Sequence, residues 1–239
     1  MNQTEFEPDD EEGQSTERTA IPEVIDWLLG MLIAIVGLLL LFAGTVLTTA
    51  LGREELGEAV DESGPVTVGT TELTRTEAID VGAAVVSWVG LGMLVAGLGL
   101  VALAVAFVYV RHRDNSRQQR GEPTSSYYAN AIRGGVVTAF FSFVGISAVV
   151  GGALAGYLEG GGSDRTTTVG AVAGLLPALP ALVIGLFTVV GLYSGLQDIG
   201  QTGPMVAGVG GILFGVLIYA GFNATLGALG GYVGGRLAE

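Results

Sequence analysis

Pro177 and Pro180 lie near the middle of a long apolar stretch, and their type and spacing come closest to a chemical site in this chain. Each proline removes a backbone N–H and is expected to kink a helix. In membrane transporters, carbonyls freed at such a break coordinate ions or substrates. Neighbouring helices also satisfy the carbonyls around prolines, and this stretch has no ionisable residue near the pair. We therefore expect a structural kink, with a transporter or channel site as the alternative.

Side chains for metal binding or nucleophilic catalysis are scarce in this sequence. The chain has no cysteine and no lysine, and His112 is its single histidine. These absences exclude disulfides, thiolate metal sites, a cysteine nucleophile and a phosphate loop ending in lysine. A Gly-x-Ser-x-Gly nucleophile elbow is also missing. We therefore expect no catalytic residue, no metal and no cofactor, in a protein that is not an enzyme.

Asn223 is the most polar side chain within the apolar stretches. It follows Gly221 and Phe222 in a last stretch that is longer than one straight span requires. This stretch is either one helix kinked near Asn223 or two pieces, and the sequence leaves both open. An amide bond to a neighbouring helix is worth about 0.6–2 kcal/mol in lipid. Its candidate partners are Thr138, Ser142, Ser147 and Thr188.

Five long apolar stretches must position these residues. None contains Asp, Glu, Lys or Arg, and each reaches the roughly 20 residues that cross about 30 Å of hydrocarbon. They run over Trp27 to Ala50, Val81 to Val110, Gly134 to Tyr157, Val169 to Ser194 and Pro204 to Gly235. The sequence therefore predicts an all-α, polytopic membrane helix bundle with five transmembrane helices and a glycine-rich C-terminal half.

The polar segments between these stretches give the domain organisation. Residues 1–21 are acidic and almost free of aromatic side chains, which predicts a disordered tail. Residues 22–110 form a transmembrane hairpin whose connecting loop, residues 51–80, is acidic. Residues 111–133 form an Arg-rich loop. Residues 134–239 form a glycine-rich membrane domain of three helices.

The acidic loop carries local signals for structure of its own. Arg53 to Glu62 can form a short helix, Ser63-Gly64-Pro65 is typical of a turn, and Val66 to Val68 alternates as a short strand does. Thr74 and Glu77 have the spacing of a capping box. The second long helix is therefore expected to begin outside the bilayer.

Positive charge predicts the orientation of the bundle. Half of the ten arginines lie in one segment between two apolar stretches, and an excess of Arg marks the cytoplasmic side. With five spans, the N-terminal tail is then cytoplasmic, whereas the acidic loop, the turn at residues 158–168 and the C-terminus are extracytoplasmic. The arginines that carry this prediction are Arg111, Arg113, Arg117, Arg120 and Arg133.

The overall charge indicates a salty environment. Twenty-three acidic residues oppose ten arginines, which gives a net charge of −13. Acid-rich aqueous segments suit very high salt, where their mutual repulsion is screened, so we expect a halophilic source. The alternative is an acidic tail and an acidic loop that coexist in a GC-rich genome. A chain of this charge repels phosphates, so no nucleic-acid partner is expected.

Glycines at four-residue spacing mark faces where helices approach closely. Lipid provides little hydrophobic drive between helices, and small residues allow close van der Waals contact. Two pairs with this spacing are Gly170 with Gly174 and Gly211 with Gly215. The six-residue segment from Gly152 recurs 75 residues later from Gly227 with five identical positions, which indicates a parallel repeat or a chance match in glycine-rich helices. The helix-packing residues are Gly152, Gly156, Gly160, Gly227, Gly231 and Gly235.

Residues 131–236 carry four motifs that can be compared with known families. These are the glycine-rich turn from Gly151 to Gly162, the helix start from Thr168 to Gly174, the Pro177-Ala178-Leu179-Pro180 kink and the closing glycine-rich helix. With these motifs the segment resembles an uncharacterised family of haloarchaeal multi-pass membrane proteins, defined as a domain of unknown function. The resemblance implies a membrane location and a halophilic source, and it implies no activity. The hairpin at Trp27 to Val110 lies outside it.

These features predict a multi-pass protein of the cell membrane without enzymatic activity. We expect a structural or interaction protein in a haloarchaeal plasma membrane, with the lipid bilayer and either further copies of the chain or another membrane protein as partners. The alternative is a small transporter or channel with its site at the Pro177/Pro180 break.

Overall fold

The computed structural model describes residues 23–118, 120, 127–141, 146–161, 164–201 and 203–239. The tail at residues 1–21 lies outside the described residues, as does most of the segment between Gln118 and Tyr127. Within the described residues the chain is predominantly helical, with one two-stranded sheet.

The helices fall into a long and a short group. The long helices are α1 (Glu23–Thr49), α3 (Arg75–Gln118), α7 (Ala178–Asp198) and α8 (Gly203–Leu237). The short helices are α2 (Arg53–Ser63), α4 (Tyr127–Phe140), α5 (Ser147–Glu159) and α6 (Thr166–Leu175), and the strands are β1 (Val66–Val68) and β2 (Thr71–Leu73). Among the described residues, four segments are long and apolar enough to cross a membrane, at Val24–Thr49, Arg75–Asp114, Ala178–Asp198 and Met205–Leu237.

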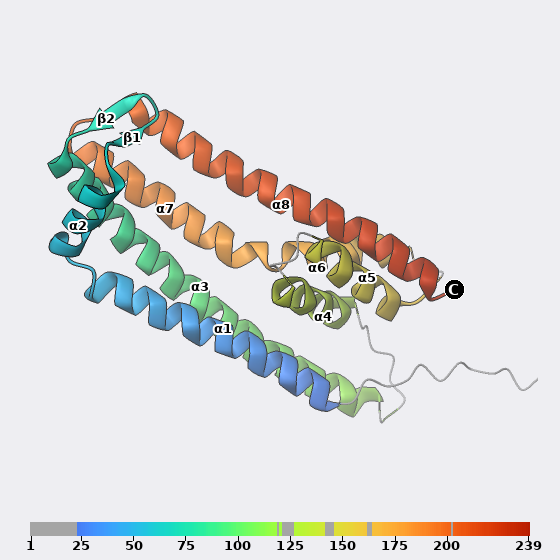
Figure 1. The fold of residues 1–239 in the computed structure, drawn as a ribbon. Helices are drawn as coiled ribbons and strands as arrows, with labels where there is room; N and C mark the ends of the chain where they lie inside the picture. The colour runs from blue at the N-terminus through green and yellow to red at the C-terminus, as the bar shows by residue number, and fades with distance from the viewer. Residues whose placement is uncertain (1–22, 119, 121–126, 142–145, 162–163, 202) are drawn as a thin grey trace, which may run out of the picture.

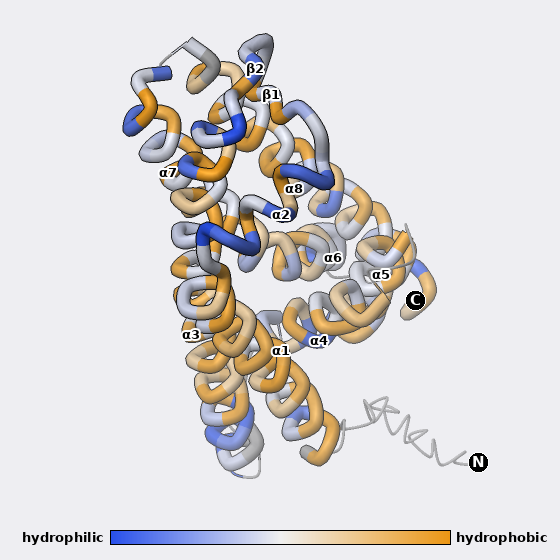
Figure 2. Tube along the Cα trace, turned by 60° about the vertical axis from the view of Figure 1, so that its left-hand side comes forward, coloured by the Kyte–Doolittle hydropathy of each residue, from blue (hydrophilic) through white to orange (hydrophobic). Residues whose placement is uncertain are grey.

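The outer faces of the long helices carry large apolar side chains. Phe42 on α1 is 70% exposed, and Phe214 and Leu217 on α8 are exposed as well. Hydrophilic colour gathers at α2 and the strands at one end of the bundle and at the end of α3 at the other, with apolar helices between them (Figure 2). Apolar surface this extensive is stable in lipid and not in water, which fits an integral membrane protein.

Glycines set the spacing of the first layers. α1 and α3 form an antiparallel pair in which Gly37 lies against Gly97 and Gly44 lies against Gly90. α3 then packs on α7, α7 on the first part of α8, and the last part of α8 on α5 and α6 (Figure 1). α3 therefore lies between α1 and α7.

The segment between α1 and α3 folds as its local signals predict. α2 ends before Gly64, and β1 pairs with β2 in an antiparallel register that joins Val66 to Leu73. The Thr74 backbone N–H donates to Glu77 Oε2 at 2.8 Å, so the capping interaction expected at the start of α3 is present. Leu73 is buried with Leu196 of α7, which attaches this small cap to the bundle.

Two exposed ion pairs tie the cap to α3. Arg53 pairs with Asp80, and Arg75 Nε donates to Asp61 Oδ1 at 2.7 Å. The hydrogen bonds from Arg75 lower the pKa of Asp61 below its usual range, because they favour the ionised carboxylate. These pairs lie at the surface, so solvent and salt weaken them.

The apolar stretch from Gly134 to Tyr157 does not form the single span that its length predicts. It contributes to two helices, α4 and α5, which pack against each other. Helices of 14 and 13 residues rise only about 20 Å each, which is short of the roughly 30 Å of hydrocarbon. Gly134 and Gly151 lie in direct backbone contact, so the two helices approach closely enough to form a hairpin. In place of the five expected spans, the described residues form four candidate spans, and the third expected span is a helical hairpin.

This hairpin changes which ends of the helices lie together. The Asn130 amide near the start of α4 donates to Glu159 at the end of α5, and Gly161 lies beside Glu239 at the C-terminus. The turn after α5 and the C-terminus therefore lie at the same end of the bundle as the Arg-rich end of α3. The predicted extracytoplasmic side of this turn and of the C-terminus assumed a fifth crossing, and the side of the membrane that they face stays a prediction.

The last helix is continuous. α8 is a single helix from Gly203 to Leu237, so Gly221 and Asn223 do not divide it into two pieces. The Asn223 amide donates to the Tyr219 carbonyl oxygen of the same helix at 2.8 Å. Among the described residues the amide is thus satisfied one turn earlier and not by the expected Thr138, Ser147 or Thr188, whereas Ser142 lies outside the described residues.

Candidate functional site

The most polar buried site of the described residues joins three helices. Asp26 of α1 accepts from Arg111 Nε of α3 at 2.8 Å through Oδ2. Its other oxygen, Oδ1, accepts from Arg133 of α4, at 3.0 Å from Nε and 2.7 Å from Nη2. Asp26 is 2% exposed, and both arginines are buried. One carboxylate therefore neutralises part of the charge of two guanidinium groups away from solvent.

Two further polar side chains extend this cluster. Arg133 Nη1 donates to Asn130 Oδ1 at 3.2 Å, and Asn130 Nδ2 donates to Glu159 Oε2 at 3.1 Å. We call the five residues Asp26, Arg111, Asn130, Arg133 and Glu159 the ion network. No buried side-chain nitrogen or oxygen atom of the described residues lacks a hydrogen-bond partner. Full satisfaction matters because a buried charge that loses its partner is strongly destabilising.

The ends of the helices position the network. Asp26 lies in the first turn of α1, where the helix dipole favours a carboxylate, and Arg111 lies about two turns before the end of α3. Arg133 lies in α4 on the side that carries Asn130 one turn earlier. Because α1 and α3 are antiparallel, the start of one and the end of the other meet at the same end of the bundle.

The sequence analysis assigned Arg111 and Arg133 only to the orientation of the bundle. The signal for their contact with Asp26 was weak but present, since Asp26 borders the first apolar stretch and Arg133 borders the third. Ionisable groups next to membrane segments usually pair with one another. Nothing in the spacing indicated which arginine, more than 80 residues away, would be the partner.

The repeated six-residue segments pack directly against each other. Gly152 of α5 lies against Gly227 of α8, and Gly156 lies against Gly231 in the same register. A side-chain carbon added at Gly152 or Gly156 would overlap backbone atoms of its partner. α5 and α8 are therefore parallel, and each copy of the repeat supplies half of one contact.

A second glycine contact holds α6 on a neighbouring face of α8, where α6 also packs against α5. Gly170 of α6 meets Gly227 and Gly231, and Gly235 meets Thr166. Backbone contact on two sides makes the end of α8 the centre of the glycine-rich domain. Gly160 has another role, because it ends α5 with a φ of 95°, which favours glycine.

The remaining glycine pair on α8 has no neighbour among the described residues. A side-chain carbon added at Gly211 or Gly215 would meet no atom within 4 Å outside its own helix. Both residues are exposed, in the half of α8 that extends away from α5 and α6. This pair therefore contacts no other helix in the part of the chain that the structure describes.

The two prolines lie where α6 gives way to α7. α6 ends at Leu175, Pro177 precedes the first residue of α7, and Pro180 falls in its first turn, where proline is tolerated. Both prolines line a cleft of about 470 Å³ between α1, α3, α4 and α7. Every residue that lines it is apolar, from Leu32 and Leu103 on one wall to Phe140 on the other.

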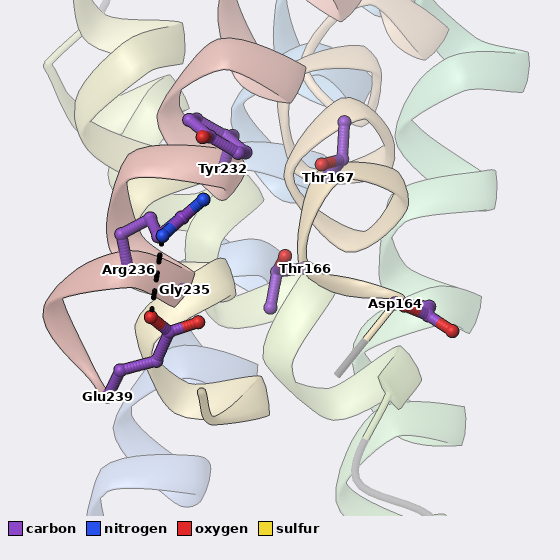
Figure 3. Close-up of a pocket in the computed structure, with 7 residues that line it drawn as sticks. All are labelled: Asp164, Thr166, Thr167, Tyr232, Gly235, Arg236 and Glu239. Atoms are coloured by element: carbon purple, nitrogen blue, oxygen red, sulfur yellow. Dashed lines mark ion pairs between the residues drawn. The ribbon is translucent and has the colours of Figure 1, made fainter. Parts of the chain in front are cut away.

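A polar depression of about 370 Å³ lies at the C-terminal end (Figure 3). Arg236 Nη1 lies 3.7 Å from Glu239 Oε2, and its guanidinium group stacks 5.4 Å from the Tyr232 ring centre. Thr166 begins α6, and Asp164 precedes it by two residues. Arg236 thus contacts a carboxylate and a ring at an exposed position, where solvent weakens the ion pair.

The other arginines predicted to set orientation lie at the same end of the molecule. Arg113 and Arg117 belong to the last turns of α3, and Arg120 follows that helix. This end of the bundle therefore carries a concentration of arginine. His112 also lies here, next to Arg111, and no group of three or more His, Cys, Asp or Glu residues in the described part of the chain is placed to bind a metal ion.

Comparisons with known proteins give one match. Residues 128–237 match the model of a family of unknown function, DUF5518. No curated protein and no solved structure matches the chain. The match covers α4 to α8 and includes Arg133, whereas Asp26 and Arg111 lie outside it. The ion network therefore joins this domain to the N-terminal helices.

Proposed function

We propose that this chain is a non-enzymatic structural or interaction protein of a haloarchaeal plasma membrane. The domain of unknown function at residues 128–237 and the apolar helices are those of an integral membrane protein. The observation that carries the proposal is the ion network, which joins the N-terminal pair α1 and α3 to that domain through buried, mutually satisfied charges. Such a contact favours a rigid bundle over two domains that move separately.

The acidic cap and the arginine-rich end serve as the interaction surfaces in this proposal. α2 and its neighbours present Glu54, Glu55 and Glu58 at one end, and the other end carries the arginines of α3. With four crossings, both termini lie on the cytoplasmic side and the cap lies outside, since arginine excess marks the cytoplasmic face. Acidic surfaces of this kind suit an exterior of high salt.

A second copy of the chain is the partner that α8 supports best. Its exposed half carries Gly211 and Gly215 with large apolar side chains around them, among them Phe214 and Leu217. In lipid, helices associate where small residues allow close approach. Among the described residues this glycine pair contacts no other helix, which leaves it available for contact with a second copy.

Disulfide crosslinking tests this proposal in a chain that has no cysteine of its own. Gly215→Cys should form a dimer on mild oxidation in membranes, whereas Leu98→Cys on an exposed face of α3 should not. Proteoliposomes that contain the protein should take up Na⁺, K⁺ and neutral amino acids no faster than empty vesicles. Monomer at both positions, or solute uptake, would contradict the proposal.

The second candidate is a small transporter or channel, which the cleft at Pro177 and Pro180 favours. If it is correct, Pro177→Ala and Pro180→Ala should change solute uptake while expression and melting stay the same. The lining of the cleft is apolar, which suits ions poorly because an ion there loses its hydration without replacement ligands. We therefore rank transport second.

A further inference from the structure

We propose that the apolar cleft beside Pro177 and Pro180 holds one hydrocarbon chain of an anionic membrane lipid, whose headgroup lies at the arginine-rich end of the bundle. The proposal rests on the depth of the cleft, its lining and the charge at its nearer end.

The cleft lies within the hydrocarbon layer. Its residues on α1 run from Leu32 to Leu40, and the candidate span of that helix runs from Val24 to Thr49. The middle of the span therefore passes along the cleft. Phe140 and Leu179, at its opposite wall, are exposed, so the cleft opens to the surroundings of the bundle.

Water is a poor occupant of this space. A buried water needs two to four polar partners, and every lining residue has an apolar side chain. An empty cleft would leave its walls without contacts, since gaps forfeit dispersion energy. The volume of about 470 Å³ falls within the range of about 300–1,000 Å³ that is typical of sites for one small molecule. A flexible hydrocarbon chain fits these requirements.

The ion network lies near one end of the cleft. Ile33 is seven residues after Asp26, about 10 Å along α1, and Ile132 of the lining is next to Arg133. α1 and α4 make little direct contact with each other. The cleft that both helices line therefore lies next to the network on α4 and about 10 Å from it along α1.

The charge at this end complements an anionic headgroup. Within the network, Asp26 and Glu159 balance Arg111 and Arg133, so the excess positive charge comes from α3, which adds Arg113 and Arg117 against Asp114. Clusters of arginine at the cytoplasmic ends of membrane helices attract anionic lipids. A lipid with its headgroup here has its chains directed along the bundle towards the cleft.

Fluorescence quenching by brominated lipids tests the site in the full chain. The reporter is Phe140→Trp in a background of Trp27→Phe and Trp88→Phe, and the reference is Leu98→Trp, on an exposed face of α3 outside the cleft. Brominated phosphatidylglycerol should reach half-maximal quenching at the reporter at a mole fraction about five-fold lower than at the reference. Brominated phosphatidylcholine should show no such difference. Identical curves at both positions would overturn the proposal.

Filling the cleft separates the chain site from attraction at the surface. Ala139→Phe places a ring in the cleft, and Ala106→Phe places the same ring on an exposed face of α3 outside it. Ala139→Phe should abolish the phosphatidylglycerol preference at the reporter, and Ala106→Phe should keep it. Ala181→Leu, also in the lining, repeats the test if Ala139→Phe lowers the melting temperature. A preference that survives filling would refute a chain in the cleft.

Discussion

Arg133 and Asp26 lie 107 residues apart in sequence and share two hydrogen bonds, from Nε at 3.0 Å and from Nη2 at 2.7 Å. Arg133 belongs to the domain of unknown function, and Asp26 belongs to the N-terminal helices outside it. Arg111 completes the contact from α3. Charged groups satisfied in this way hold two parts of a membrane bundle in one relative position, because separating them would leave each charge without a partner.

The first prediction concerns this contact. Asp26→Asn leaves Arg111 and Arg133 close together without a carboxylate, and breaking a buried ion pair costs about 3–5 kcal/mol. We expect a lower unfolding midpoint in detergent. Asp61→Asn is the matched control, because it removes a carboxylate from an exposed pair and should shift the midpoint far less. Equal shifts in both variants would show that burial of the network contributes nothing.

The glycine contacts give a second prediction. Gly156→Leu and Gly231→Leu each force a side chain into backbone of the facing helix, and overpacking typically costs about 1–3 kcal/mol. Both should lower the melting temperature in detergent. Gly215→Leu adds the same side chain where no neighbour lies within 4 Å, so it should leave the melting of the monomer as in the wild type. Leu98→Gly, on an exposed face of α3, should likewise lower the melting temperature less than Gly156→Leu or Gly231→Leu does. A loss at Gly215 as large as at Gly231 would contradict the contact.

Labelling of single cysteines tests the number of crossings. Ser63→Cys in the cap should react with an impermeant maleimide in intact cells, whereas Ser116→Cys and Glu239→Cys should react only after lysis. Ser116 and Glu239 lie at the arginine-rich end of the bundle, and Ser63 lies at the other. With five crossings Glu239→Cys would label together with Ser63→Cys, and that result would reject the four-crossing arrangement.

Salt dependence tests the halophilic origin. The Debye length grows from about 3 Å at 1 M salt to about 10 Å at 0.1 M, so repulsion among the acids of the cap and the tail should increase as KCl is diluted. We expect aggregation or a lower melting temperature at about 0.1 M, with a modest change because packing within lipid does not depend on salt. Circular dichroism during dilution measures it, and constant melting would remove the argument for a halophilic source.

Local signals in the sequence were sufficient for the cap between α1 and α3. Thr74 and Glu77 are three residues apart and form their hydrogen bonds within one helical turn. The turn at Gly64 and the strand at Val66 to Val68 depend likewise on neighbouring residues. Interactions within a few residues leave a readable pattern, because the chain geometry alone brings the partners together.

The sequence by itself determined the membrane location, since long runs without charge are stable only in lipid, and the four-residue glycine spacing marked the faces available for contact. Only the tertiary structure decided that Gly134 to Tyr157 turns back as α4 and α5, because stretch length gives the capacity to cross and not the path. It also decided that Gly156 meets Gly231 and that Asp26 meets Arg133. Those partners are set by the packing of distant helices, and a single sequence carries no record of which of several similar faces or charges meet.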